Sequence, residues 1–463
     1  MRLRLTAYIF VGLLVSSTAS QSLDVPVKLS LQDAVGLALK THIDVKSSET
    51  SQLASLSRLR VQQINTSLDF GTDTVASYES GTSEISGRTF AGLTLDTPAG
   101  TEASLDITPF GTGGERGYMG MFIRQPILRG RGWLSNKADA LQNAQSSVAI
   151  MRQELYQSRQ SAVMSVTEAY FRAILERERV KVQERALEIA KQSAEGYRKR
   201  EAEQLVTGLD VRRAEINVAE TEDDLNLQQQ AARAAMDRLM LAIGAGVGQS
   251  PNLTDPIPEV KGDPPALEEA IKVALQNRPE LTVYEQRLAD ERRSLAMAQD
   301  ELRPDLDVVA GFQSTSSGAG FLSGSMFNEG YSSVGVEFRV PLDRRIVKEN
   351  RDIAARALDI LAEQQTYQKE RIVEDVRQAY RTLEQAKISL EIYSTNLDRA
   401  KEQLYFAQRL MEEGEGSSRD TLEAQGSLTR VESGVLSAKT DIYLARMNLR
   451  HAMGEDLTNV RYE

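Results

Sequence analysis

Residue types that commonly do chemistry are scarce in this chain. Its 463 residues include no cysteine, which excludes disulfides, thiolate nucleophiles and cysteine-based metal sites. Its two histidines, His42 and His451, stand singly among polar neighbours, and such histidines are more often solvated or helix-capping residues than metal ligands. We therefore predict no catalytic residue, no metal site and no cofactor.

The motifs of common catalytic sites are also missing from the sequence. It has no G-x-S-x-G elbow, no Walker A lysine motif, no H-E-x-x-H pair and no EF-hand loop. Gly130-Arg131-Gly132 resembles a fragment of a phosphate-binding loop, but it follows a strand that ends in proline, so we interpret it as a tight turn. An enzyme that uses only carboxylates remains an alternative, although most acids lie on outer helix faces, where solvated charges are usual.

The elements that would position any site occur twice. A shift of 210 residues aligns a long helical stretch without a gap and matches Ala169 with Ala379, Tyr170 with Tyr380, Asp210 with Asp420, Ala214 with Ala424, and Gly244 with Gly454. The helices that open the repeats, near 29–42 and 266–281, are offset by 236 instead. The first repeat is therefore longer by 26 residues, which we assign to its strand region.

Each repeat contains one very long helix and one return helix. The ranges 135–203 and 345–412 contain no proline, and helices of this length would extend about 100 Å. Heptad rows support the prediction: Val376, Leu383, Leu390, Leu397 and Leu404; Ala379, Ala386, Tyr393, Ala400 and Ala407; and, more loosely, Leu141, Val148, Leu155, Ala162 and Ala169. Return helices are predicted at 210–243 and 420–453, each followed by glycine.

The remaining segments are a leader, a linker and a tail. Arg2 and Arg4, a short apolar run and small residues up to Ala19 predict a secretory signal peptide. The predicted organisation is signal peptide 1–19, first repeat 20–247, proline-rich linker 248–265, second repeat 266–454 and tail 455–463. The formal charge of −11 disfavours nucleic acid as a partner, since phosphate binding needs positive potential.

Strands are predicted at about 67–127 and 305–341, where apolar and polar residues alternate. Near the end of the second range, Val334 and Val336 face one way while Glu337 and Arg339 face the other. This pattern suits a wall between lipid and water, and it equally suits a half-buried sheet of a soluble protein. The additional residues of the first repeat contain a hairpin at 90–108, which we interpret as an outward extension of the loop between two wall strands, with an extension of the barrel as the alternative.

Together these features resemble the TolC family of outer membrane factors, most specifically in the strand-to-helix segments 124–133 and 338–345 and in two helix tips. The resemblance covers nearly the whole mature chain. It implies a mainly α protein with membrane β: a homotrimer whose long antiparallel helical hairpins form a periplasmic α-barrel, with four strands per chain in a shared 12-stranded outer-membrane barrel. It also implies contact with outer-membrane lipid, a periplasmic adaptor (membrane fusion protein) and an inner-membrane transporter as partners, and no nucleic acid.

The tips carry the most detailed part of the resemblance. The second has the family's glycine, aspartate and alanine at Gly414, Asp420 and Ala424. The first has Asp210 and Ala214 in the matching places, but glutamine stands where the glycine would be. The resemblance assigns the adaptor-facing tips to Gln204, Leu205, Gly208, Gly414 and Gly416.

The resemblance also implies a gate at the periplasmic entrance. Asp420 and Glu423 match acidic residues that form a cation-favouring ring, and their spacing of three puts them on one helix face. Helix capping would place acids there without any pore. Asp210 matches the aspartate of an intersubunit tether that keeps the entrance closed. The tether's usual arginine and tyrosine positions are Gly416 and Met411 here, so Arg419 or Arg212 is the expected substitute.

These observations favour a passive exit duct in the outer membrane, extending into the periplasm, within a tripartite efflux or type I secretion system. Its cargo would be small molecules or polypeptides. The alternative is a secreted or periplasmic coiled-coil adaptor or scaffold without a pore. Trp133, the only tryptophan, is expected either at the membrane interface or packed beneath the first long helix.

Overall fold

A computed structural model describes residues 26–79, 84–112, 118–259, 262–315, 329–413 and 415–458. The expected signal peptide, most of the hairpin loops at the far ends of the strands, Gly414 and the last residues of the tail lie outside these ranges. The described residues divide into two compact units. Unit 1 holds 50–153 and 282–366, and unit 2 holds 26–49, 154–281 and 367–458.

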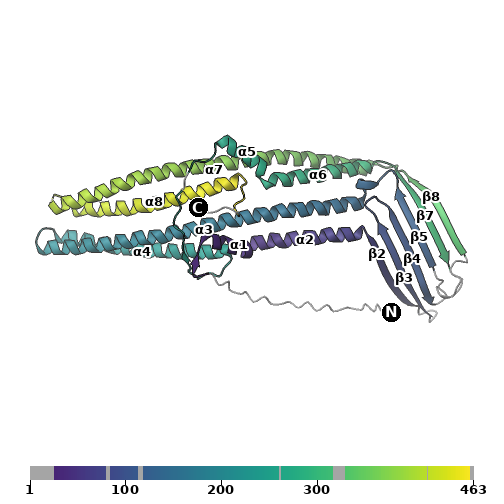
Figure 1. The fold of residues 1–463 in the computed structure, drawn as a ribbon, viewed down its shortest axis with the longest axis horizontal. Helices are drawn as coiled ribbons and strands as arrows, with labels where there is room; N and C mark the ends of the chain where they lie inside the picture. The colour runs from purple at the N-terminus through teal and green to yellow at the C-terminus, as the bar shows by residue number, and fades with distance from the viewer. Residues whose placement is uncertain are drawn as a thin grey trace. The chain divides into compact units, whose positions relative to one another are not determined.

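Unit 1 contains a six-stranded antiparallel sheet, called the main sheet below. Its strands are β2 (Leu68–Glu79), β3 (Glu84–Asp96), β4 (Glu102–Thr112), β5 (Tyr118–Pro126), β7 (Asp305–Thr315) and β8 (Glu329–Arg339). They pair in chain order, so β2 and β8 form the two edges (Figure 1). The sequence predicted four strands, and the additional pair is β3 and β4.

The hairpin of β3 and β4 therefore does not extend an outer loop. Its turn is held at the strand-to-helix junction, where the Gly132 amide donates to the Ala99 carbonyl at 2.9 Å and the Ser135 hydroxyl donates to the Pro98 carbonyl at 2.7 Å. From this turn both strands run the length of the sheet, β3 paired with β2 and β4 paired with β5. Alternation alone could not reveal this, because it is the same in a wall strand and in a separate hairpin.

The main sheet has one apolar and one charged face. One cross-strand row is apolar on all six strands: Leu68, Leu95, Ala103, Ile123, Ala310 and Val334. On the other face, Arg124 lies 3.7 Å from Glu102 and donates to Asp307 from two nitrogens, so charges on β4, β5 and β7 are paired across the sheet. Leu68, Phe70, Val334 and Phe338 on the apolar face are more than half exposed.

Helices make up most of the rest of both units. The long helices are α3 (Asn136–Ala202) and α7 (Arg345–Glu413), against predicted ranges of 135–203 and 345–412. The return helices are α4 (Gly208–Ile243) and α8 (Ser418–Ala452). Two further helices, α2 (Ile43–Asn65) and α6 (Pro279–Asp300), precede the strands and were not predicted. Their apolar residues form no sustained heptad row, and on α2 several of them are exposed, so the pattern that identified α7 is missing.

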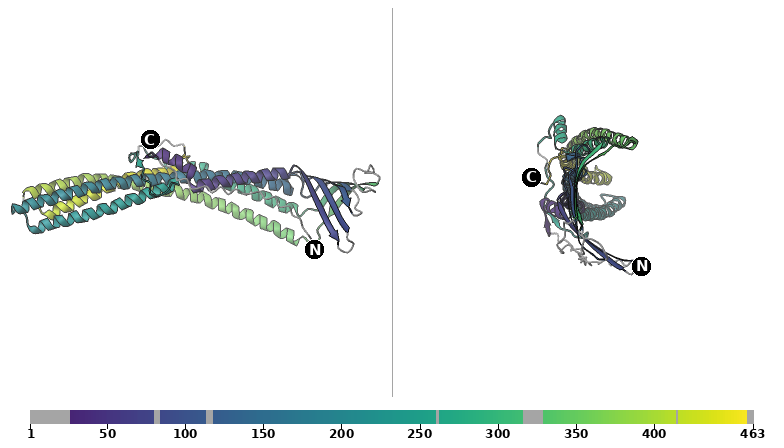
Figure 2. Two further views of the ribbon diagram at one scale, coloured as in Figure 1. Left: turned by 90° about the horizontal axis from the view of Figure 1, so that it is seen from below. Right: turned by 90° about the vertical axis from the view of Figure 1, so that its right-hand side faces the viewer.

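Unit 2 is built from two antiparallel helix pairs, α3 with α4 and α7 with α8 (Figures 1 and 2). The predicted seam on α7 packs inward, since Val376, Ala379 and Leu383 are almost fully buried. Small residues in this row allow close helix approach. The seam continues toward the tip with half-buried Leu390, Leu397 and Leu404.

Shorter elements of unit 2 hold the repeats together. Strand β1 (Lys28–Leu29) pairs in parallel with β6 (Asn252–Leu253), which lies in the predicted linker. Next to β6, Asp255 accepts hydrogen bonds from the amide that begins α1 (Leu31–Thr41) and from the Tyr170 hydroxyl, both at 2.7 Å. Burial, together with the bond to Asp255, raises the pKa of fully buried Tyr170. Helix α5 (Leu267–Asn277) then opens the second repeat.

No helix in the described ranges combines the length and the apolar character needed to cross a membrane.

Candidate site at the helical tips

The first tip connects α3 to α4 through a turn at residues 203–207. Gln204 has φ of 58° and is the only described residue besides glycine in the left-handed region. A side chain there is strained, which gives a physical reason for the glycine that the resemblance led us to expect. Helix α4 then begins with a capping box, in which the Thr207 amide and hydroxyl donate to Asp210 Oδ2 at 3.1 and 2.6 Å.

The second tip connects α7 to α8 and is capped differently. Ser417 is the capping residue, and its hydroxyl accepts from the Arg419 amide at 3.1 Å. Before it, the amides of Glu415 and Gly416 both donate to the Leu410 carbonyl. A Cβ on Gly416 would lie 2.7 Å from the Met411 nitrogen, so this turn has no room for the arginine that the resemblance places there.

The two tips are joined to each other within unit 2. The hydroxyl of Ser418, which is only 2% exposed, donates to Asp210 Oδ1 at 2.5 Å. Nearby, Arg200 Nη1 donates to the Met411 carbonyl at 3.2 Å, and Gln425 donates to the Ser193 hydroxyl at 2.9 Å. We call the bond between Asp210 and Ser418 the tip latch, because it ties the first turn of α4 to the first turn of α8.

The electrostatics of the tip latch favour an ionised aspartate. The hydroxyl of Ser418 and then that of Thr207 hold the pKa of Asp210 below its ordinary value, and Arg213, 3.8 Å away, acts in the same direction. The neighbouring phenol of Tyr197 is 5% exposed, and burial raises its pKa. It packs with Val211 and Ala214 in a small apolar cluster behind the latch.

A seam between α3 and α8 extends the connection far beyond the tips. From tip to base it comprises Ser193 with Gln425, Arg185 with Glu432 at 3.6 Å, Arg179 with Ser437 at 2.5 Å, Arg172 with Asp441 at 2.9 Å, and Phe171 with Tyr443 at a ring separation of 4.6 Å. The pairing is antiparallel, and most of its members are polar. The sequence alone does not reveal this seam, because each residue has its partner in the other repeat.

Asp420 and Glu423 lie beside the latch but outside it. Both are exposed, and within the described residues neither side chain forms an ion pair. Asp420 occupies the same helical position as Asp210, yet the cap of α8 is made by Ser417. These two aspartates, equivalent under the 210-residue shift, are therefore used differently: Asp210 is engaged and Asp420 faces solvent.

The arginines expected as partners of Asp210 are engaged elsewhere or exposed. Arg212 Nη1 pairs with Glu215 at 3.1 Å, and Arg419 is exposed. Inside one chain, the contacts of Asp210 are with Thr207, Ser418 and Arg213. A tether from Asp210 to a second copy remains a hypothesis.

Several large apolar side chains are exposed around the two tips. On the first, Leu205 is 70% and Leu209 is 58% exposed. Near the end of α7, Tyr405, Phe406 and Leu410 are also exposed. Gly208 begins α4 between the two leucines. Exposed apolar groups of this size are typical of surfaces that bind another protein.

The histidines and Trp133 lie apart from the tips. His42 ends α1, and its Nδ1 accepts from the Asp44 amide at 3.3 Å, as a capping residue does. His451 lies in the last turn of α8, where burial lowers its pKa. Trp133 lies in unit 1, 61% exposed, in the short 3-10 helix Gly132–Leu134 after β5. The predicted turn at 130–132 has both glycines in the left-handed region, and the Gly130 amide donates to Asp300 at 2.7 Å.

Known proteins of the same fold are found among solved structures. VceC from Vibrio cholerae is 16% identical, with a TM-score of 0.70 over 92% of this chain and 96% of its own. The open state of MtrE from Neisseria gonorrhoeae is 18% identical, with a TM-score of 0.70 over 92% and 89%. CmeC from Campylobacter jejuni is 15% identical, with a TM-score of 0.67 over 92% and 86%. No curated protein sequence matches the chain significantly.

One part of the sequence also matches a known family. Residues 270–455, nearly all of the second repeat, match the sequence profile of the outer membrane efflux protein family. The second repeat therefore resembles this family. Both the TolC-type recognition and the predicted fold class, mostly helical with a small sheet, are thereby confirmed.

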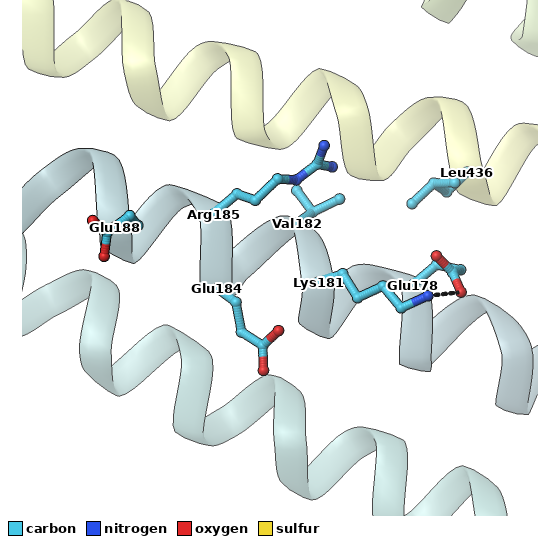
Figure 3. Close-up of a pocket in the computed structure, with 7 residues that line it drawn as sticks. All are labelled: Glu178, Lys181, Val182, Glu184, Arg185, Glu188 and Leu436. Atoms are coloured by element: carbon cyan, nitrogen blue, oxygen red, sulfur yellow. Dashed lines mark hydrogen bonds and ion pairs between the residues drawn. The ribbon is translucent and has the colours of Figure 1, made fainter. Parts of the chain in front are cut away.

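The family that matches the second repeat is that of outer membrane efflux proteins, and both CmeC and MtrE are outer membrane channels. The alternative of a scaffold without a pore is not supported. Figure 3 shows a depression along α3 beside α8, lined by Glu178, Lys181, Val182, Glu184, Arg185, Glu188 and Leu436. Lys181 pairs there with Glu178 at 2.7 Å, and the charged, open lining suits a polar protein surface better than a small apolar ligand.

Proposed function

We propose that this protein is an outer membrane efflux protein and that it works as a homotrimeric exit duct, closed at its helical tips by the tip latch and its neighbours. A periplasmic adaptor and an inner-membrane transporter would deliver small molecules or polypeptides to it. The observation that supports this proposal best is the tip itself, where an ionised aspartate of one helix pair binds a buried serine of the other.

The main sheet supports the membrane part of the proposal. Its apolar face carries large exposed side chains, and its charged face pairs arginine with aspartate across strands. A sheet with these two faces suits a boundary between lipid and water. Trp133, exposed where β5 gives way to α3, would lie at the edge of the lipid.

The exposed apolar residues of the tips support the adaptor as a partner. Leu205 and Leu209 project from the first tip, and Phe406 is exposed near the second. Docking an adaptor over these residues would remove them from water and would act on the two turns that the latch connects. The free energy of adaptor binding would then offset the loss of the tip latch, the hydrogen bond between Asp210 and Ser418.

Asp420 and Glu423 would control which ions enter. Both carboxylates are exposed beside the latch, and the cap of α8 does not require either of them. Three copies would bring six such carboxylates to the entrance, where a ring of like charge attracts cations.

Planar-bilayer recording of the purified protein tests the proposal. We expect small, rarely open channels from the wild type and a cation preference that falls when Asp420 and Glu423 are both replaced by Ala. Replacing exposed Asp398 and Glu402 on α7 by Ala provides a control of equal charge change. If neither the wild type nor Asp210→Ala formed channels, the exit-duct proposal would be wrong. If ion selectivity stayed unchanged in the double variant, Asp420 and Glu423 would not line the entrance.

A further inference from the structure

The strands β3 and β4 have the character of wall strands. Leu95 on β3 and Ala103 on β4 stand in one apolar row between Leu68 of β2 and Ile123 of β5. A second row repeats the pattern with Phe70, Leu93, Leu105, Met121 and Phe312. A hairpin folded outside the wall has no reason to match its apolar face, residue by residue, to that of the strands on both sides.

The edges of the main sheet are open and complementary. Within the described residues, β2 pairs only with β3 and β8 pairs only with β7, which leaves one side of each edge strand unpaired. The two strands have 12 and 11 residues. Because six strands alternate in direction, β2 and β8 run in opposite directions, so β8 of one copy and β2 of another can continue the antiparallel order.

The helices attached to the two edge strands carry matching apolar stripes. On α2, which leads into β2, Leu53, Val61 and Ile64 are 52–62% exposed. On α7, which follows β8, Ile346, Ile353 and Ile360 recur every seven residues and are 55–74% exposed. A contact between copies that joins the edge strands would also bring these two stripes toward each other, which removes apolar surface from water.

We propose that β8 of each copy pairs with β2 of the next, so that every copy contributes six strands to the outer-membrane wall and the hairpin of β3 and β4 widens it. Pairing of this kind satisfies the backbone groups of both edges, which lipid cannot do. The inference rests on the trimer of the proposed function. Three copies with six strands each form a wall of eighteen strands, whereas four strands per copy would give twelve. Because the diameter of a barrel grows roughly linearly with strand number, the eighteen-stranded wall is about one and a half times as wide as a twelve-stranded one. The exit of this protein therefore accommodates cargo of larger cross-section than four strands per copy would allow.

Paired cysteines test the proposal directly, because the natural chain has none. In the full-length protein in its membrane, Phe70→Cys with Leu93→Cys and Leu105→Cys with Met121→Cys are direct partners and are expected to form disulfides within one chain. Phe70→Cys with Met121→Cys should not, since three strand spacings put them about 14 Å apart. Cysteines placed along the outer edge of β2 and of β8, for example Thr72→Cys with each of Val334→Cys and Val336→Cys, should give covalent dimers and trimers.

Two outcomes would overturn the proposal. One is a disulfide between positions 70 and 121, which would mean that β2 pairs with β5 and that the hairpin lies outside the wall. The other is the absence of covalent oligomers from a full scan of β2 against β8. These results are separable from the proposed function. Channels in a bilayer together with a 70–121 disulfide would support the exit duct and contradict the six-stranded contribution to its wall. Covalent oligomers without channels would support the pairing of β8 with β2 and contradict the exit duct.

Discussion

At the scale of single residues, Asp210 is the most heavily used side chain of the tips. One carboxylate oxygen closes the capping box with Thr207 and the other binds Ser418. These bonds hold its pKa below the ordinary value of about 3.9. The stabilisation is therefore present at neutral pH and is lost only as pH falls through that lowered pKa. We expect the latch to be insensitive to pH between 7 and 5.

The latch and the cap can be separated by mutation. Asp210→Ala removes both, Ser418→Ala removes only the latch, and Thr207→Ala removes only the hydroxyl's bond of the cap while the residue 207 amide can still donate. A hydrogen bond to a charged group contributes about 1.5–3 kcal/mol, so Asp210→Ala and Ser418→Ala should each raise the open probability in bilayers by about tenfold or more. Thr207→Ala serves as the matched control. If Thr207→Ala opened the channel and Ser418→Ala did not, the cap rather than the latch would hold it closed.

His451 gives unit 2 a pH dependence of its own. Burial lowers its pKa, Arg278 adds to this, and Glu280 and Asp375 oppose it. The folded state thus prefers neutral imidazole, so the contribution to stability is complete above the ordinary pKa of about 6.5 and falls as pH decreases toward the lowered value. The melting temperature followed by circular dichroism should drop less between pH 7.5 and 5.5 in His451→Gln than in the wild type. His42→Gln is the control, and equal drops in His451→Gln and wild type would contradict the assignment.

At the scale of elements, heptad spacing predicted α7 well because a long helix in a shallow layer must bury one narrow stripe. Val376, Ala379 and Leu383 are indeed buried in that stripe. Neither α2 nor α6 offered such a signal, and the strand pair β3 and β4 carried a signal that fits two arrangements. Period and alternation reveal which face of an element is apolar, and they do not reveal what that face meets.

A substitution of Leu383 tests how much the heptad seam of α7 contributes to the free energy of unfolding. It is 1% exposed in the core formed by α5, α7 and α8. Leu383→Ala should destabilise unit 2 by about 2–5 kcal/mol, since buried leucine-to-alanine changes lose transfer energy and leave a cavity. Glu384→Ala, on the exposed face of the same turn, is expected to change stability by less than about 0.5 kcal/mol. Urea denaturation monitored by helical circular dichroism compares the two variants. Similar midpoints would mean that the heptad seam of α7 does not form a stabilising core.

At the scale of the whole molecule, the chain offers an internal reporter of its place in the membrane. Trp133 is the only tryptophan and is 61% exposed beside the main sheet. In reconstituted vesicles we expect its emission to be quenched more strongly by lipids brominated near the head group than by lipids brominated near the chain ends, because indole favours the interface. Trp133→Phe with Phe338→Trp moves the probe to the edge strand β8 as a control. If only aqueous iodide quenched the emission, Trp133 would not lie at the membrane interface.

The sequence alone determined the repeat, the long helices, the heptad seam of α7 and the alternation of the strands. These are local or periodic properties, and hydrophobic spacing encodes them directly. The tertiary structure decided which residues meet. It brought Ser418 to Asp210 across 208 positions, aligned α3 with α8 through polar pairs, and placed β3 and β4 inside the sheet. Such contacts depend on the register between distant segments, which no pattern within either segment specifies.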